Sequence, residues 1–526
     1  IFRNERFNRG VSILMLDINN LENTFEVRNL SNSNQIDENL KSKKFFWTLE
    51  FVPSVDKVLK YELDKLNELF LRVQNSPLVA GFSVADRVHS DRDPDSIAAA
   101  SQILLRTKKQ PLVHLSGKGK EAHELSESIN RLTTLGLKNV LVLTGDKLKE
   151  QNLVERNRYL ESVPAIQIVK KTSPSLNIAV AFNPFKYREE DCMAQYLKLE
   201  KKIGAGANYI ITQIGFDHRK YQELADWKLK NDINIPAVGN VMLLYARGAR
   251  YMRKHQLAGV TVSNGFLQLL EFEEKLPDKG VDRALRRLAL QIIQLKNLGY
   301  AGVQLTGIHS YEMLIKLEAK VDELSALCVN EEVWGDAWNE CMCFPDGVVV
   351  DSAPKNAWYM SDLHLASASA IERYKFWGMK MLHTLFFSKG PMYYLFALIL
   401  APVKDRHGTA GKFLEKFERV IKKPLVGCDT CGNCRLEYTQ YICPESCPKG
   451  LANGPCGGTS ENLCEFRDRE CIHSVKYRIA KNGGDLNSLK LNLISAIPKE
   501  IRHTSSYPAH FSGHGIKVTV IKSDKR

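Results

Sequence analysis

The chain has 526 residues and a net charge of +13, with 44% hydrophobic and 25% charged residues. This length is too great for a single hydrophobic core and the composition is that of a globular protein, so two or more domains are expected. The positive charge favours acidic partners, but no nucleic-acid-binding motif accompanies it, and a solvated basic surface is the better interpretation.

The first 43 residues are polar, rich in asparagine and weakly patterned, which predicts an extension ahead of the first domain. Ile1–Gly10 carries charges of both signs and does not resemble a cleavable leader. The most apolar stretch, Met392–Val403, is shorter than the ~20 residues that span a bilayer. We therefore expect a buried helix there and no membrane span.

Short β-branched or aromatic runs alternate with segments of helical periodicity between residues 44 and 320. The expected strands are Phe45–Phe51, Leu78–Val84, Pro111–Leu115, Asn139–Leu143, Asn177–Phe182, Tyr209–Ile214, Ile235–Val241 and Gly302–Thr306. The expected helices are Val58–Arg72, Asp95–Thr107, Glu121–Leu135, Glu190–Gly204, Lys220–Asn231, Ala246–Gln256 and Val281–Leu298. This alternation predicts parallel βαβ units, and eight strands predict a closed (β/α)8 TIM barrel rather than an open sheet.

Three further segments follow the predicted barrel. Residues 321–410 are expected to form a helical linker region, with Leu363–Tyr394 as a helix. Residues 411–480 hold most of the cysteines and are expected to form a small domain. Residues 481–526 are expected to form a polar tail.

Eight of the twelve cysteines lie between Cys428 and Cys471. A single cysteine cluster in a large chain without a leader indicates a metal site in a reducing compartment, so a cytoplasmic protein is expected. The cluster begins with a Cys-x2-Cys-x2-Cys run, a spacing that lets three thiolates hold one iron–sulfur cubane. Eight thiolates divide into two [4Fe–4S] clusters, with two zinc sites as the alternative. The predicted ligands are Cys428, Cys431, Cys434, Cys443, Cys447, Cys456, Cys464 and Cys471.

Polar residues stand where the predicted strands end, which in a (β/α)8 barrel is the face that carries the chemistry. Any one of them alone would be an ordinary solvated strand terminus, but as a set they predict a binding site at the barrel mouth. The set is Glu50, Ser83, His114, Ser116, Asp146, Asn183, Thr212, Gln213, Asp217, Thr306 and His309.

Three sequence motifs resemble the methylenetetrahydrofolate reductase family over about residues 44–312. They are Trp47-Thr48-Leu49-Glu50-Phe51-Val52-Pro53, Val140-Leu141-Val142-Leu143-Thr144-Gly145-Asp146, and the most specific, Gly206-Ala207-Asn208-Tyr209-Ile210-Ile211-Thr212-Gln213. Residues 411–475, including Asn453-Gly454-Pro455-Cys456-Gly457-Gly458, resemble the cysteine-rich C-terminal module, zinc- or cluster-binding, found with the methylenetetrahydrofolate reductases of anaerobes.

The resemblance implies a noncovalent flavin, FAD or FMN, that reduces a methylene-pterin at the barrel mouth. It assigns Glu50 as the acid that protonates the pterin and Asp146 as the residue that tunes the flavin. The implied cofactor-binding residues are His114, Ser116, Thr144, Gly145, Asp146 and Lys202. The implied substrate-binding residues are Asn183, Gln213 and Thr306.

The chain departs from the family pattern in two loops. The glycine-rich loop after the second strand is replaced by Ser83–Val88, and a family His-Pro stretch by Phe182–Lys186. No Rossmann glycine motif offers a nicotinamide site. We therefore expect electrons to arrive through the cysteine module from a ferredoxin-like donor or partner oxidoreductase subunits, and the chain can also form a homo-oligomer.

Two other functions fit the same sequence. One is a flavin-free barrel that binds a pterin and handles methyl or corrinoid groups. The other is a non-catalytic or electron-transfer subunit of a larger complex, an alternative that the altered loops keep open.

Overall fold

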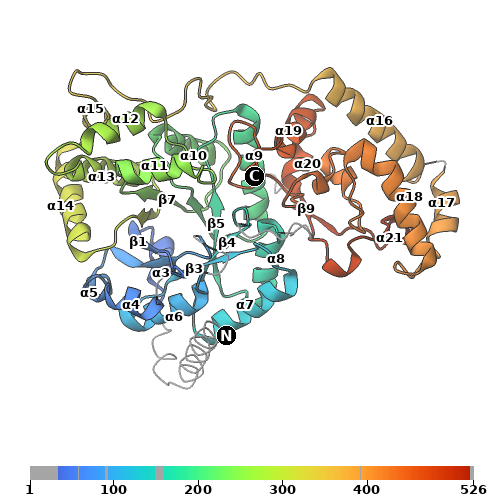
Figure 1. Cartoon of the computed structure of the whole chain (residues 1–526), viewed down its shortest axis with the longest axis horizontal. Coiled ribbons are helices and arrows are strands. Elements are labelled where there is room, and N and C mark those ends of the chain that lie inside the picture. The colour runs from blue at the N-terminus through green and yellow to red at the C-terminus, as the bar shows by residue number, and fades with distance from the viewer. Residues whose placement is uncertain are drawn as a thin grey trace, which may run out of the picture.

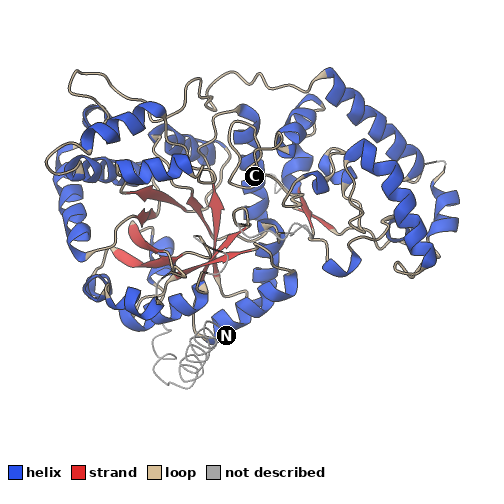
Figure 2. Ribbon diagram, viewed as in Figure 1, coloured by secondary structure: helices blue, strands red, loops and turns tan. Residues whose placement is uncertain are grey.

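The computed structural model describes residues 33–56, 58–88, 90, 93–148, 159–390 and 392–521. Eight parallel strands close into a barrel in the order of the sequence, which confirms the predicted (β/α)8 fold (Figure 2). The strands are β1 (Phe46–Phe51), β2 (Val79–Val84), β3 (Leu112–Ser116), β4 (Asn139–Leu143), β5 (Asn177–Phe182), β6 (Tyr209–Thr212), β7 (Ala237–Met242) and β8 (Gly302–Thr306).

The barrel closes because β1 pairs with both β2 and β8, in parallel register. Trp47 lies opposite Val303 of β8, and Leu49 lies opposite Leu305. These apolar side chains are buried, as expected where helices cover the outside of a barrel. All eight strands therefore end at one mouth.

Helices surround the strands on the outside (Figure 1). They are α4 (Leu59–Asp64), α5 (Asn67–Asn75), α6 (Ser96–Thr107), α7 (Ala122–Thr134), α8 (Ser162–Thr172), α9 (Glu189–Gly204), α10 (His218–Lys230), α11 (Ala246–Lys254), α12 (Asn264–Glu273), α13 (Val281–Asn297) and α14 (Tyr311–Leu327). The expected helix Val58–Arg72 is divided into α4 and α5. Helix α8 was not expected, because its first half is buried almost all round and lacks an amphipathic pattern.

The predicted extension is an ordered part of the barrel in its last residues, while residues 1–32 lie outside the described chain. Helix α3 (Gln35–Ser42) covers the end of the barrel opposite to the mouth. Its N-cap residue Asn34 donates a 2.8 Å hydrogen bond to Asn139 at the start of β4. Ile36 of the same helix packs into the barrel interior.

The C-terminal region lies beside the barrel, against α8 and α9 (Figure 1). Its helices are α16 (Ala370–Phe386), α17 (Tyr393–Leu400), α18 (Thr409–Val426), α19 (Ile472–Asn482), α20 (Leu486–Leu491) and α21 (Tyr507–Phe511), with short 3-10 turns η1 (Leu436–Thr439), η2 (Pro444–Ser446) and η3 (Lys499–Ile501). Helix α15 (Glu331–Cys341) packs instead on the barrel helix α13. Strands β9 (Asn492–Ile494) and β10 (Val518–Val520) form a small antiparallel sheet. Much of the expected polar tail is thus folded.

Two expectations in this region were wrong. Leu363–Tyr394 is not one helix, because α16 begins only at Ala370 and ends at Phe386, before α17. Met392–Val403 is not a buried helix, because of the residues of α17 only Leu400 is buried. Among the described residues, no helix is long and apolar enough to cross a membrane.

Candidate functional site

A cavity of about 230 Å³ occupies the mouth of the barrel. Nine of the ten barrel residues predicted to bind or react line it, and the tenth, Thr306, hydrogen-bonds one of those nine. The nine are Glu50, His114, Ser116, Thr144, Gly145, Asp146, Asn183, Lys202 and Gln213. The ends of the strands thus bring together side chains that lie far apart in the chain.

Glu50 contributes a partly buried carboxyl group to this cavity. It lies in β1, and the Thr306 hydroxyl is 2.8 Å from its Oε2 atom. Burial raises the pKa of Glu50 above its ordinary value, and the Thr306 hydrogen bond opposes this only in part. A carboxyl group with a raised pKa can hold a proton near neutral pH and deliver it to a ligand.

His114 is a neutral imidazole in the same wall. Its Nε2 atom lies 2.7 Å from the Ser83 hydroxyl. Burial lowers the pKa of His114 to about 4. This side chain therefore offers the cavity a hydrogen-bonding ring rather than a charge.

The loop after β2, which lacks the expected glycines, brings an arginine to the cavity instead. Arg87 donates to the Ser116 hydroxyl at 3.2 Å and to the Lys118 carbonyl at 3.0 Å. Asp86 accepts a 3.1 Å hydrogen bond from the backbone of Ser116. The sequence of this loop departs from the family pattern, and its adjacent acid and base, Asp86 and Arg87, were a signal of a polar site.

Lys202 reaches the cavity from the last turn of α9. Its ammonium donates to the Ala181 carbonyl at 2.5 Å, and burial lowers its pKa to about 7. Burial therefore disfavours the charged form of this amine. An anionic group bound beside it would favour the charged form.

Gly145 and Asp146 lie at the rim of the mouth. Gly145 has a φ of +88°, and a Cβ atom there would lie 2.8 Å from the Cβ of Lys118, so the turn requires glycine. The Gly145 carbonyl accepts a 2.8 Å hydrogen bond from Lys449, which also pairs with Glu465 at 2.5 Å. Asp146 itself is exposed at this rim.

The side-chain amides of Asn183 and Gln213 form hydrogen bonds with backbone groups. Asn183 donates at 2.9 Å to the carbonyls of Gly259 and Gly457. Gln213 donates to Ala258 at 3.2 Å and accepts from Ile214 at 2.9 Å. The structure thus places Asn183 in the contact between barrel and cysteine module.

Two buried oxygen atoms that line the cavity have no hydrogen-bond partner in the described chain, Gln304 Oε1 and Ser162 Oγ. Unpaired buried polar atoms are rare in proteins, and a ligand with donor groups would satisfy both. Gln304 projects from β8 and was not singled out from the sequence. These atoms, with Glu50 and His114, fit a polar heterocycle such as a flavin or a pterin.

The cysteine module covers part of this mouth. Pro455–Gly458 lines the cavity, and Cys456 is among its lining residues. Gln195 donates to the Cys456 carbonyl at 2.7 Å, and Lys198 donates to Pro455 at 3.0 Å. The cavity is therefore smaller than the roughly 300–1,000 Å³ of a typical ligand pocket.

None of the twelve cysteines, all of which the structure describes, forms a disulfide, and among the described residues no group of three or more potential ligands is already arranged around a metal position. Burial raises the pKa of Cys443, and the neighbouring Cys428 and Cys431 raise it further. Burial also raises the pKa of Cys428, and Cys434 acts on it in the same direction. These four thiols are therefore neighbours.

The other four predicted ligands form a second neighbourhood. Burial raises the pKa of Cys471 strongly, and nearby Cys456 and Cys447 raise it further. Burial is the main cause of the raised pKa of Cys464, and Cys447 raises this pKa further. Backbone hydrogen bonds across the turn, from Cys464 to Arg469 at 2.9 Å and from Cys471 to Asn462 at 2.7 Å, hold this segment together.

Glu161 ties the module to the barrel. This buried carboxylate pairs with Lys198 at 2.9 Å and accepts hydrogen bonds from the backbone of Ala452 and Asn453 at 3.0 Å. Burial alone would raise the pKa of Glu161, but Lys198 and Asn453 together hold it below the ordinary value. Its contribution to stability is therefore present at neutral pH and is lost as the pH falls through that lowered pKa.

Replacing Glu161 with alanine is expected to destabilise the protein by about 3–5 kcal/mol, because Lys198 remains buried without its partner. Thermal unfolding at neutral pH measures the loss, and limited proteolysis reports release of the module. Glu127, exposed on α7, provides the control, and its replacement with alanine should change little. Equal unfolding temperatures for the two variants would contradict this account of the interface.

The geometry defines a (β/α)8 protein with a polar ligand site at the mouth and a cysteine module against it. A family model described as methylenetetrahydrofolate reductase matches residues 35–321, and one described as methylene-tetrahydrofolate reductase C terminal matches residues 409–497. The first match covers more than half of the chain. The chain belongs to the methylenetetrahydrofolate reductase family.

Individual relatives match only parts of the chain. Methylenetetrahydrofolate reductase 1 of Schizosaccharomyces pombe is 25% identical over 219 residues, 40% of this chain and 34% of that protein. The 5,10-methylenetetrahydrofolate reductase of Buchnera aphidicola subsp. Acyrthosiphon pisum is 26% identical over 162 residues, 31% of this chain and 54% of that protein. The match thus spans about a third of the first relative's length and half of the second's.

A solved structure also overlaps with the chain. It is an uncharacterized protein from Clostridium thermocellum that binds two copies of 5-methyl-5,6,7,8-tetrahydrofolic acid. The overlap has a TM-score of 0.43 and 10% identity, and covers 56% of this chain and 99% of that one.

Proposed function

We propose that this chain is a flavin-dependent reductase that converts methylene-tetrahydrofolate, or a related methylene-pterin, to the methyl form. The observation that carries the proposal is Glu50, a partly buried carboxyl group with a raised pKa at the mouth of a family barrel. Reductive opening of a methylene bridge needs a proton on the pterin nitrogen, and Glu50 is the acid placed to deliver it.

The residues divide the work between the two ligands. The unpaired oxygens of Gln304 and Ser162 can accept hydrogen bonds from the donor groups of a heterocycle. His114 contributes a neutral imidazole to the same cavity. Lys202 becomes fully charged beside an anionic group. A bound flavin, FAD or FMN, would supply the hydride at this site. Gln213 and Thr306 are the side chains we assign to orient the pterin.

The module is proposed to hold two [4Fe–4S] clusters, with two zinc sites as the alternative. The supporting observation is that the thiols raise one another's pKa within two sets of four, which we infer to be the two ligand sets. Cys456 belongs to the second neighbourhood and also lines the barrel cavity. Clusters held there would supply single electrons beside the flavin site, and an acidic carrier such as ferredoxin, or partner oxidoreductase subunits, would deliver them. The free thiols also fit a cytoplasmic protein.

The partly covered mouth favours one alternative, an electron-transfer subunit of a larger complex. Because Pro455–Gly458 reduces the cavity, binding of both ligands together requires this segment to move aside. A barrel that never opens would serve only as a scaffold.

Release of flavin on denaturation decides between these functions. Protein purified without oxygen and denatured in the dark should release FMN or FAD, and the native protein should reduce methylene-tetrahydrofolate when given a low-potential electron donor. Absence of flavin, together with failure to bind added FMN or FAD, would refute the reductase and leave the scaffold or the flavin-free pterin barrel.

A further inference from the structure

Helix α18 exposes its apolar side chains and buries charged ones, the reverse of an ordinary surface helix. Glu418 and Lys422 are buried on its inner side as an ion pair with a separation of 2.8 Å. Ser505 donates to Glu418 at 2.8 Å, and the backbone of Ser506 does so at 2.7 Å. These contacts fix which side of the helix faces inward. The exposed apolar stripe consists of Phe413, Phe417, Val420, Ile421 and Leu425.

Helices α16 and α17 lie near α18 at the end of the molecule away from the barrel (Figure 1), and they also expose apolar side chains. None of the residues of α16, all of which the structure describes, is fully buried. Tyr374 is 82% exposed and Trp377 61%. Helix α17 has no charged residue, and its Leu398 is 75% exposed. We call the exposed apolar side chains of α16, α17 and α18 the apolar face.

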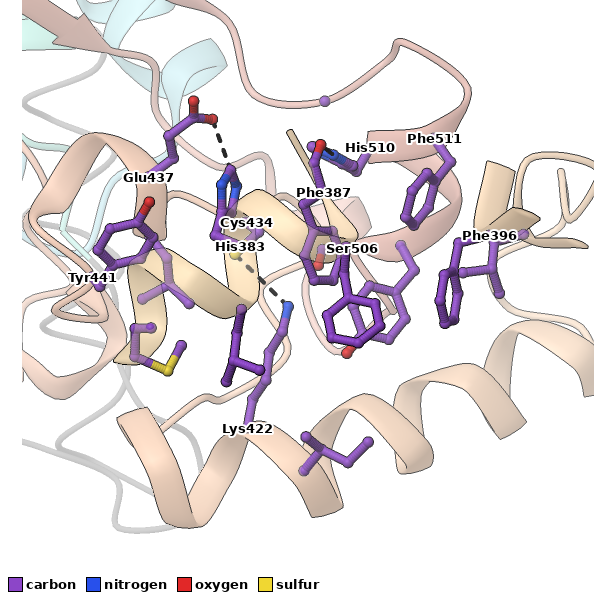
Figure 3. Close-up of a pocket in the computed structure, with 18 of the residues that line it drawn as sticks. His383, Phe387, Phe396, Lys422, Cys434, Glu437, Tyr441, Ser506, His510 and Phe511 are labelled. Atoms are coloured by element: carbon purple, nitrogen blue, oxygen red, sulfur yellow. Dashed lines mark hydrogen bonds and ion pairs between the residues drawn. The ribbon is translucent and has the colours of Figure 1, made fainter. Parts of the chain in front are cut away.

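An aromatic cavity of about 430 Å³ lies between α16 and α18, and Phe417, Ile421 and Leu425 of the apolar face are among its lining residues (Figure 3). Phe387, Phe396 and Phe511 line it. Its ionisable groups have partners within the protein, since Lys422 pairs with Glu418 and the His510 ring contacts the Phe387 carbonyl at 3.0 Å. Both the apolar face and the aromatic cavity therefore favour contact with hydrocarbon.

Positive charge is concentrated around the apolar face. Residues 370–426 contain eleven Lys or Arg and four Asp or Glu, and so contribute +7 of the chain's net +13. On α18 the exposed basic residues follow helical spacing next to the apolar stripe. They are Lys412, Lys416, Arg419 and Lys423.

We propose that the apolar face docks this protein on the surface of an anionic membrane. An interfacial helix with apolar and basic stripes side by side buries the first in the boundary between headgroups and acyl chains and pairs the second with lipid phosphates. Trp377 and Tyr394 are the residue types that favour this boundary. A second copy of the chain would instead bring two positive faces together, which like-charge repulsion opposes. This inference does not rest on the proposed reductase activity.

Vesicle sedimentation of the full-length protein tests the proposal. Binding to phosphatidylcholine vesicles with roughly one third phosphatidylglycerol should be at least about tenfold stronger than to pure phosphatidylcholine, and should weaken as salt is raised. A blue shift of tryptophan fluorescence on binding, absent from Trp377→Phe, would place α16 at the lipid.

Two sets of substitutions separate the apolar and basic contributions. The first is Phe413→Ser with Phe417→Ser and Leu398→Ser, and the second replaces Lys412, Lys416, Arg419 and Lys423 with Gln. All seven positions are exposed, so folding should survive, and circular dichroism checks this. Each set should lower vesicle binding by about tenfold or more. The charge-matched control replaces exposed Lys43, Lys65, Lys171 and Lys279 with Gln and should bind like the parent.

Three results would overturn the proposal. They are absence of binding to the anionic vesicles, retention of binding by either set, and an equal loss in the control. A dimer that the apolar set converts to a monomer, without vesicle binding, would assign the face to a second copy instead.

Discussion

Glu50→Gln is expected to lower reduction of the methylene substrate by about 10²-fold or more, because glutamine keeps the shape of the side chain but cannot donate the proton. Reduction of bound flavin by the electron donor should change little, since that step needs no proton from Glu50. Stopped-flow measurement of the two half-reactions separates these effects. Glu312→Gln, an exposed carboxyl substitution at the start of α14, is the matched control.

The raised pKa of Glu50 also determines the pH dependence. Substrate reduction should fall as the pH rises through this pKa, because the carboxyl group loses its proton, and Glu50→Gln should remove that limb of the profile. The folded protein binds the proton more tightly than the unfolded chain does, so ionisation of Glu50 lowers stability as the pH rises. Glu50→Gln should therefore raise the unfolding temperature at neutral and higher pH. Unchanged turnover with a higher unfolding temperature would leave Glu50 as a buried acid without the catalytic role.

Substitution of single cysteines is expected to remove half of the bound metal, which is the second large effect. Protein prepared without oxygen should carry about eight iron atoms and a broad brown absorption that bleaches on reduction. Cys431→Ser should disrupt the first neighbourhood and Cys464→Ser the second, each leaving about four iron atoms. Iron analysis with absorption and paramagnetic resonance spectra measures the loss.

Cys343→Ser is the control for these variants, because this thiol lies outside both neighbourhoods and contacts the carbonyl of Phe344 at 3.1 Å. Its iron content should match the parent. Limited proteolysis shows whether each variant keeps the module folded. Stoichiometric zinc without iron, in protein never exposed to oxygen, would reject the clusters and support the zinc alternative. Iron content unchanged in both Cys431→Ser and Cys464→Ser would reject the assignment of ligands.

The barrel and most of the residues at its mouth could be predicted from the sequence. Alternating strand and helix patterns have local causes, so eight strands could be read in order, and parallel strands in a barrel necessarily end at one face. Glu50, His114 and Gln213 followed from their positions at strand ends. Gln304 did not, because an unpaired buried oxygen is recognised only when all of its neighbours are known.

How the C-terminal region packs against the barrel could be seen only in the folded chain. The motif around Cys456 indicated metal, but its contact with the barrel mouth depends on Gln195 and Lys198, more than 250 residues away in the chain. Helix α18 has one apolar and one charged side, and its sequence alone does not show which side packs against the protein. Ser505 and Ser506 stabilise Glu418 on the inner side and so leave Phe413 exposed. Local patterns specify the elements, whereas these long-range hydrogen bonds and ion pairs decide which face each element buries.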